Sequence, residues 1–201
     1  MSSTNNRTIL LKKMMAVAGL IWFTYLIYHL FSVLTFHAGE AAFNAFYAWF
    51  NSSWIYPVLL TLLGSTIVFH IYVAVTRQLT NNKSVGDTRY KKPYPKAIPR
   101  VVAWSGAVLV FAFIVIHSVQ MLAIDIDTTN LYQQMEEIFS DQLMWGIYGL
   151  GLLAISAHLQ HGLSNVLQTL GICSCQFHKV AWLIVIIIMV GFASIPLSII
   201  L

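Results

Sequence analysis

Five long apolar runs constrain this chain more than any other feature of its sequence. They cover residues about 14–36, 54–76, 101–123, 143–165 and 179–201, and are almost free of charged side chains. Each is long enough to cross a bilayer as a helix, which needs about 20 mostly apolar residues. Because the bilayer core offers no water to the backbone, runs of this length are expected to be helical. The sequence therefore predicts an all-α membrane protein with five transmembrane helices.

The composition excludes a water-soluble globular protein. Of the 201 residues, 58% are hydrophobic and only 9% are charged, and the mean hydropathy is +0.75. Soluble domains contain about 25% charged residues. Five spans and their short loops use the whole length, which leaves no room for a separate soluble catalytic domain. We therefore expect one transmembrane domain over residues 1–201.

The charged residues predict how these helices are oriented. All eleven Lys and Arg lie before span one, between spans two and three, or just before span five, whereas six of the seven acids lie in the other two loops. Lys and Arg accumulate on the cytoplasmic side of membrane proteins. The N-terminus is therefore expected in the cytoplasm and the C-terminus outside.

Two loops on the outer side carry apolar side chains at helical spacing. Residues 39–50 and 131–139 each predict a short amphipathic helix lying at the outer interface. The basic inner loop 77–100 contains Pro93, Pro95 and Pro99 and is expected to be irregular.

His29, His70, His117 and His158 lie one in each of the first four runs. Ionisable side chains at such depth indicate a functional site. With a rise of about 1.5 Å per residue, His29 and His117 lie roughly 6 Å outside the midplane of their helices. On the same basis, His70 and His158 lie about 6–7 Å inside it. The four histidines thus form two pairs in two layers, roughly 13 Å apart along the membrane normal.

Two stacked haems, each with two histidine ligands, require this arrangement. One neutral imidazole on each side of a porphyrin gives a six-coordinate iron, which suits electron transfer because no position stays open for a substrate. The depth of the side chains predicts His29 and His117 as ligands of an outer haem. It predicts His70 and His158 as ligands of an inner haem.

Several nearby residues keep alternative interpretations. Gly106 and Gly151 lie close to the faces of His117 and His158, and either leave room for a haem or serve ordinary small-residue helix packing. His161 lies one turn after His158 and either replaces it as a ligand, contacts a haem propionate or faces a quinone. His37 and His178 lie at span edges and are interpreted as interfacial residues.

The other chemical signals are weak. Cys173 and Cys175 form a lone C-x-C motif with no second pair, which favours reduced thiols over a zinc or iron–sulfur site. The sequence contains no phosphate-binding loop, nucleophile elbow or dinucleotide fingerprint. The basic loop is explained by topology, so nucleic acid is not an expected partner.

Sequence motifs around the histidines resemble a known family. They are YLIYHL at His29, GEAAFNAF after the first span, VFHIYVA at His70, AWSG at 103–106 ahead of His117, and HLQHGLSNVLQTLG at 158–171. The chain resembles the membrane-anchor cytochrome b subunit of succinate:quinone oxidoreductases, in the five-helix, two-haem form called type B and its b558 branch. The resemblance covers nearly the whole chain, and the last motif is its most specific part.

This resemblance implies a set of ligands and partners. It implies two haems b in a bundle of the first four helices, with His158, the first histidine of H-x-x-H-G, as the ligand in place of His161. It also implies a flavoprotein subunit carrying FAD and an iron–sulfur subunit. The chain itself would carry electrons between that iron–sulfur subunit and ubiquinone or menaquinone, as part of succinate dehydrogenase or fumarate reductase (respiratory complex II) in a bacterial cytoplasmic membrane. It would not oxidise succinate itself.

Polar residues near each predicted haem are candidates for contact with haem or quinone: His161, Ser164 and Gln168 on the inner side, and Tyr28, Ser32 and Gln120 on the outer side. Two other interpretations remain open for the chain as a whole. One is a cytochrome b anchor of a different quinone-linked oxidoreductase. The other is a haem-free transporter or receptor whose histidines bind protons or a metal.

Overall fold

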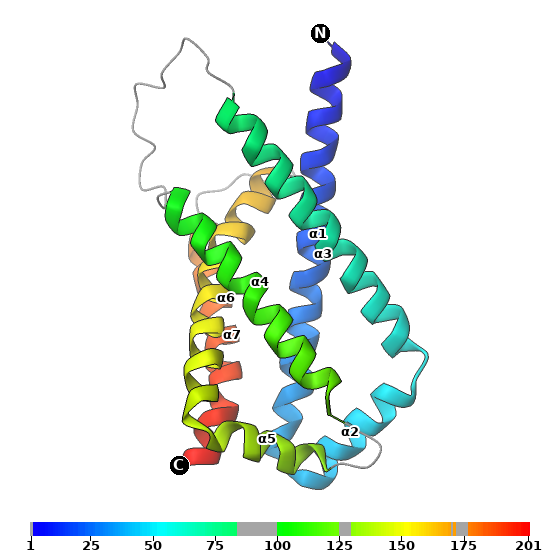
Figure 1. Ribbon diagram of the computed structural model, residues 1–201, viewed down its shortest axis with the longest axis vertical. Coiled ribbons are helices and arrows are strands. Elements are labelled where there is room, and N and C mark those ends of the chain that lie inside the picture. Colours follow the sequence, from blue (N-terminus) through cyan, green and yellow to red (C-terminus); the bar gives the residue numbers. More distant parts are fainter. Residues whose placement is uncertain (1, 84–99, 125–129, 170, 172–176) are drawn as a thin grey trace.

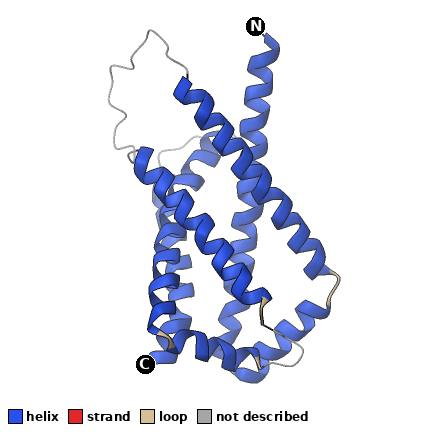
Figure 2. Cartoon of the chain, in the orientation of Figure 1, coloured by secondary structure: helices blue, strands red, loops and turns tan. Residues whose placement is uncertain are grey.

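The computed structural model describes residues 2–83, 100–124, 130–169, 171 and 177–201. All the regular secondary structure in these ranges is helical, as the apolar runs predict (Figure 2). The elements are α1 (Ser2–Leu34), the short 3₁₀ helix η1 (Thr35–Ala38), α2 (Glu40–Ser52), α3 (Ile55–Lys83), α4 (Arg100–Leu122), α5 (Leu131–Ser140), α6 (Gln142–Thr169) and α7 (Phe177–Ile200).

Four segments are long and apolar enough to cross a membrane: Ile9–Ala38, Ile55–Arg77, Gln142–Leu163 and Lys179–Ile200. In α4, the part whose side chains are described, Gly106–Leu122, is a shorter apolar helix. The whole of α4 has 23 residues, a length of about 35 Å. The structure therefore has the character of a multi-pass membrane protein. The third predicted span, residues 101–123, corresponds to α4 and stays a prediction.

The surface of the long helices suits contact with lipid. Large apolar side chains are exposed along them, including Phe31 on α1, Val68 on α3, Leu150 on α6 and Val190 on α7. A soluble monomer rarely exposes apolar area on this scale. A hydrocarbon environment removes the cost of that exposure.

Helix α1 lies at the centre of the packing. It contacts α3, α6 and α7, and α6 also contacts α4 and α7 (Figure 1). Helix α7 therefore also packs against two of the first four long helices, α1 and α6. Gly191 of α7 explains the close approach: a Cβ atom there would lie 2.7 Å from Cδ1 of Leu30 on α1.

The two predicted amphipathic helices are present as α2 and α5, and they cross one end of the bundle (Figure 1). Their apolar faces do more than line an interface, because they share a buried core. Phe43 of α2 is 1% exposed and lies in one cluster with Leu131 and Phe139 of α5, and with Val33 and Ile195 of the long helices. The two short helices therefore close this end of the bundle.

The opposite end of the bundle carries the described basic residues. Helices α1, α4 and α7 start there, and α3 and α6 end there (Figure 1). Lys12, Lys13 and Lys179 lie near those helix starts, whereas Glu136 and Glu137 lie on α5 at the other end. The predicted irregular loop begins later than expected, because α3 continues to Lys83. Its three prolines lie outside the described residues.

Asn130 holds the two short helices together. Its side chain accepts hydrogen bonds from Nδ2 of Asn44 (2.7 Å) and from the Gln133 backbone N–H (3.3 Å), and donates to Glu40.

Asn130→Ala removes this cap and leaves Asn44 without its acceptor, so we expect a loss of about 1–2 kcal/mol of stability. Unfolding of the detergent-solubilised protein measures it. Gln133→Ala, which keeps the backbone donor, is the control, and equal stability of the two variants contradicts the assignment.

Candidate functional site: two histidine pairs

The four histidines of the long helices come together in two pairs. The rings of His29 on α1 and His117 on α4 have centroids 5.7 Å apart with 55° between their planes. The rings of His70 on α3 and His158 on α6 have centroids 6.5 Å apart with 72° between their planes. Each pair joins two different helices, and these are the pairings expected from depth.

The two pairs lie at different levels of the bundle. His70 lies beside Gly19 of α1, whose Cβ would be 3.6 Å from Cε1 of His70. His29 follows Gly19 by ten residues, or about 15 Å of helix. On the other side of the bundle, His117 contacts Tyr148 of α6, which precedes His158 by ten residues. Helices α1 and α6 therefore give the same separation between the two histidine pairs, about 15 Å.

We call His70 and His158 the inner pair, and His29 and His117 the outer pair. The hydrogen bond of His70 shows which of its ring nitrogens carries the proton. Nδ1 of His70 lies 3.3 Å from the backbone oxygen of Met15 on α1. A carbonyl oxygen only accepts hydrogen bonds, so Nδ1 carries the hydrogen and, in the neutral ring, Nε2 holds a free lone pair. Histidines that bind a metal usually donate their second ring N–H to a carbonyl or carboxylate in this way.

The outer pair leads to the same tautomer through side chains. Tyr148 donates its hydroxyl proton to Oε1 of Gln120 at 2.8 Å, and the Gln120 amide donates to Sδ of Met144. The phenol oxygen therefore acts as acceptor for Nδ1 of His117, 3.2 Å away. Nε2 of the neutral His117 ring keeps its lone pair.

His29 is held by rings and by a hydrogen-bonded backbone. Tyr25 stacks on its ring, with centroids 5.6 Å apart and 4° between the planes. Ser32, 5% exposed, donates to the His29 carbonyl at 2.7 Å, which leaves Ser32 Oγ to accept from the Tyr47 hydroxyl at 3.1 Å. Burial raises the pKa of Tyr47 on α2 to about 12, against a smaller opposing effect of Ser32. The phenol therefore stays a donor at neutral pH.

The two glycines singled out in the sequence differ in what surrounds them. A Cβ at Gly151 would lie 2.3 Å from Cδ2 of Phe113, whose ring stacks on His117 with centroids 5.8 Å apart. Gly151 therefore serves close packing of α6 against an α4 side chain. Gly106 has no atom within 4 Å of a Cβ built on it, so it faces open space.

The remaining candidate residues lie away from the pairs or outside the described part. His158 and His161 are both exposed, but His158 is the one whose ring meets His70, whereas His161 bonds to Asn165 on its own helix. Tyr28 is 38% exposed and packs against Phe50 of α2. His37 bonds to Ser194 at the end of the bundle that α2 and α5 cover. The side chains of Ser164, Gln168 and His178, and both cysteines, lie outside the described residues.

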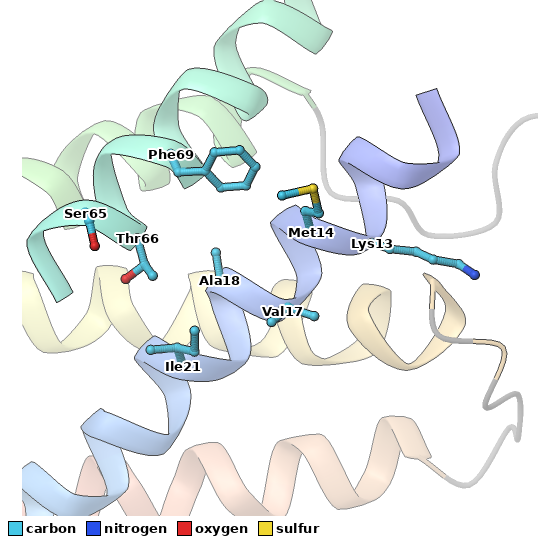
Figure 3. Close-up of a pocket in the computed structure, with 8 residues that line it drawn as sticks. All are labelled: Lys13, Met14, Val17, Ala18, Ile21, Ser65, Thr66 and Phe69. Atoms are coloured by element: carbon cyan, nitrogen blue, oxygen red, sulfur yellow. The ribbon is translucent and has the colours of Figure 1, made fainter. Parts of the chain in front are cut away.

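A groove of about 350 Å³ lies between α1 and α3 (Figure 3). Met14, Ala18 and Phe69 form part of its apolar wall, and Lys13 lies at one end. The α1 residues that meet His70 are Met15 and Gly19, on a neighbouring face of that helix. Neither His70 nor His158 is among the residues that line the groove.

The donor sets fit a haem with two axial histidines. Two imidazoles that bind one metal ion from opposite sides, each through a nitrogen about 2 Å away, have ring centroids roughly 6 Å apart. The two observed spacings, 5.7 and 6.5 Å, lie on either side of that value. No group of three or more His, Cys, Asp or Glu side chains gathers in the described part of the chain. Zinc sites take three or four protein ligands, whereas a porphyrin supplies four nitrogens itself and needs only two.

Comparison with known proteins adds no relative. No protein-family model, curated protein or solved structure matches this chain.

The structure adds neighbours of the histidines that sequence reasoning did not find. Tyr148 and Phe113 surround His117, and the Met15 carbonyl faces His70. In the sequence, Tyr148, Phe113 and Met15 do not differ from the other apolar and aromatic residues of the long runs. Tyr148 precedes His158 by ten residues, about 2.8 helical turns, which places it roughly 80° away around α6. The spacing therefore does not point to Tyr148.

Proposed function

We propose that this chain is a membrane-anchor cytochrome b that carries electrons between an iron–sulfur protein and a membrane quinone, with one haem b at each histidine pair. The single observation that carries the proposal is the pairing itself. Two pairs of rings meet across different helices at metal-bridging spacing, about 15 Å apart along the bundle.

The tautomers of two ligands support this assignment. Nδ1 of His70 and Nδ1 of His117 each donate a hydrogen bond, which leaves the Nε2 lone pair of each neutral ring available to a metal. His29 and His158 face these rings from α1 and α6. When bound, a haem with two histidine ligands supplies one-electron transfer without an open coordination position.

The protein around His29 and His117 would hold the rings of this pair in place and exclude water. Tyr25 stacks on His29, Phe113 stacks on His117, and the core shared by α2 and α5 closes the bundle beyond the outer pair. A fixed, water-poor setting lowers the reorganisation that accompanies electron transfer. The aromatic packing therefore suits an electron carrier better than a transport pathway, which has to open to water.

The charge distribution supports the orientation and the partners. We infer that the end with Lys12, Lys13 and Lys179 faces the cytoplasm, and that α4 also crosses the membrane, as the third of five spans. A basic surface there favours docking of an acidic iron–sulfur subunit. Together with the family resemblance, this leads us to propose a succinate:quinone oxidoreductase in a bacterial cytoplasmic membrane, with an FAD-carrying subunit as the third partner.

The test is a reduced-minus-oxidised spectrum of the purified chain with quantification of haem. The expected result is a low-spin b-type spectrum and a haem-to-protein ratio near two. A ratio near one contradicts the two-haem assignment. A chain that folds with no b-type haem would instead favour a transporter or receptor. The subunits that co-purify with the chain separate a succinate:quinone oxidoreductase from another quinone-linked enzyme.

A further inference from the structure

The two histidine pairs differ in the group that receives the second ring N–H. In the inner pair, His70 donates to the backbone carbonyl of Met15. In the outer pair, His117 donates to the phenol of Tyr148, and that phenol donates onward to Gln120. A backbone carbonyl is present whatever the side chain, whereas the outer acceptor depends on the identity of two residues.

We propose that Tyr148 is a positioning residue of the outer pair, which fixes the tautomer of His117 and sets the reduction potential of the outer haem independently of the inner haem. The inference rests on the proposed function and deepens it. It concerns how the protein makes its two electron-carrying centres unequal, a property that the pairing of histidines does not itself provide.

The direction of the effect follows from ligand basicity. A hydrogen bond from Nδ1 to an acceptor makes the imidazole a stronger electron donor through its other nitrogen. A more basic ligand stabilises ferric iron over ferrous iron, so the bond to Tyr148 lowers the potential of the outer haem. Gln120 acts through Tyr148, because drawing the phenol proton away polarises the chain and makes the phenol oxygen a better acceptor.

The packing around Tyr148 separates its hydroxyl from its ring. Its ring meets Phe113 edge-on at 5.4 Å, Phe139 at 4.9 Å and His117 at 5.8 Å between centroids. These contacts belong to the ring and remain in phenylalanine. Tyr148→Phe therefore removes the acceptor from His117 while leaving the aromatic packing in place.

The experiment is a spectroscopic redox titration of the full complex with Tyr148→Phe. We expect the midpoint potential of the outer haem to rise while that of the inner haem stays unchanged, at an unaltered haem-to-protein ratio. The electron paramagnetic resonance signal of the ferric outer haem should shift with it. Gln120→Leu keeps the phenol and is expected to shift the same potential upward by a smaller amount.

A matched control uses a tyrosine that belongs to neither histidine pair. Tyr72 lies on α3 and is 65% exposed. Tyr72→Phe removes a phenol oxygen outside both pairs and should leave both potentials unchanged.

The possible results separate the two proposals. A shift confined to the outer haem supports the role of Tyr148. An unchanged potential, or an equal shift of both haems, overturns it while leaving the electron-carrier function standing. If Tyr148→Phe loses the outer haem, Gln120→Leu decides, and no shift in that variant overturns the inference. Absence of low-spin haem from the unmodified protein refutes the proposed function before any variant is compared.

Discussion

His117→Ala is expected to remove one of two haems and to leave the other in place. His117 meets His29 from α4, whereas the other pair joins α3 and α6 about 15 Å away. Loss of one axial ligand therefore affects one centre only. The haem-to-protein ratio should fall from about two to about one, and the low-spin spectrum should lose one component. Haem quantification and a difference spectrum of the purified variant measure both changes.

Two further substitutions check the pairing. His29→Ala should remove the same spectral component as His117→Ala, and His70→Ala should remove the other one. His37→Ala is the control, because His37 bonds to Ser194 outside both pairs and both haems should be retained. Loss of both haems from folded His117→Ala protein would count against two independent centres.

Gly151→Val is expected to destabilise the outer pair through packing rather than through ligation. The first added atom would lie 2.3 Å from the ring of Phe113, and that ring stacks on His117. The ring has to move, or α6 has to separate from α4, at a cost of at least about 1–3 kcal/mol. We expect a lower unfolding midpoint and loss of the outer haem, measured by thermal unfolding and haem quantification of the solubilised protein.

Gly149 provides a closely matched control on the same helix. It is exposed, and no atom lies within 4 Å of a Cβ built on it. Gly149→Val has the same intrinsic effect on helix propensity as Gly151→Val, so the difference between the variants isolates the contact with Phe113. Equal stability and equal haem content of the two variants would refute this account of Gly151.

The pairing of the histidines was predictable from the sequence because it depends only on how deep each side chain lies along its helix. The rise of an α-helix is constant, so the position of His29 or His70 within its apolar run predicts its level in the membrane. Side chains on different helices at the same level are then able to meet. The short helices α2 and α5 were predictable for a similar reason, since their apolar residues recur at helical spacing.

The surroundings of the histidines were not accessible in the same way. Tyr28 and Ser32 were equal candidates in the sequence, yet Ser32 is buried beside the His29 carbonyl and Tyr28 packs outward on Phe50. Which side of α1 faces the interior depends on its rotation about its own axis. That rotation is set by the neighbouring helices, and in an all-apolar span the hydrophobic pattern leaves it open.

The sequence by itself determined the helical, membrane-spanning character of the chain, the separation of basic from acidic residues, and the levels of the four histidines. These properties depend on helix rise and on the cost of placing charge in hydrocarbon, which act on each segment separately. Only the tertiary structure decided that α7 joins the bundle, that Gly151 accommodates Phe113, and that Tyr148 accepts a hydrogen bond from His117. Each of these contacts depends on how two helices turn toward each other, and side-chain packing between them fixes that orientation.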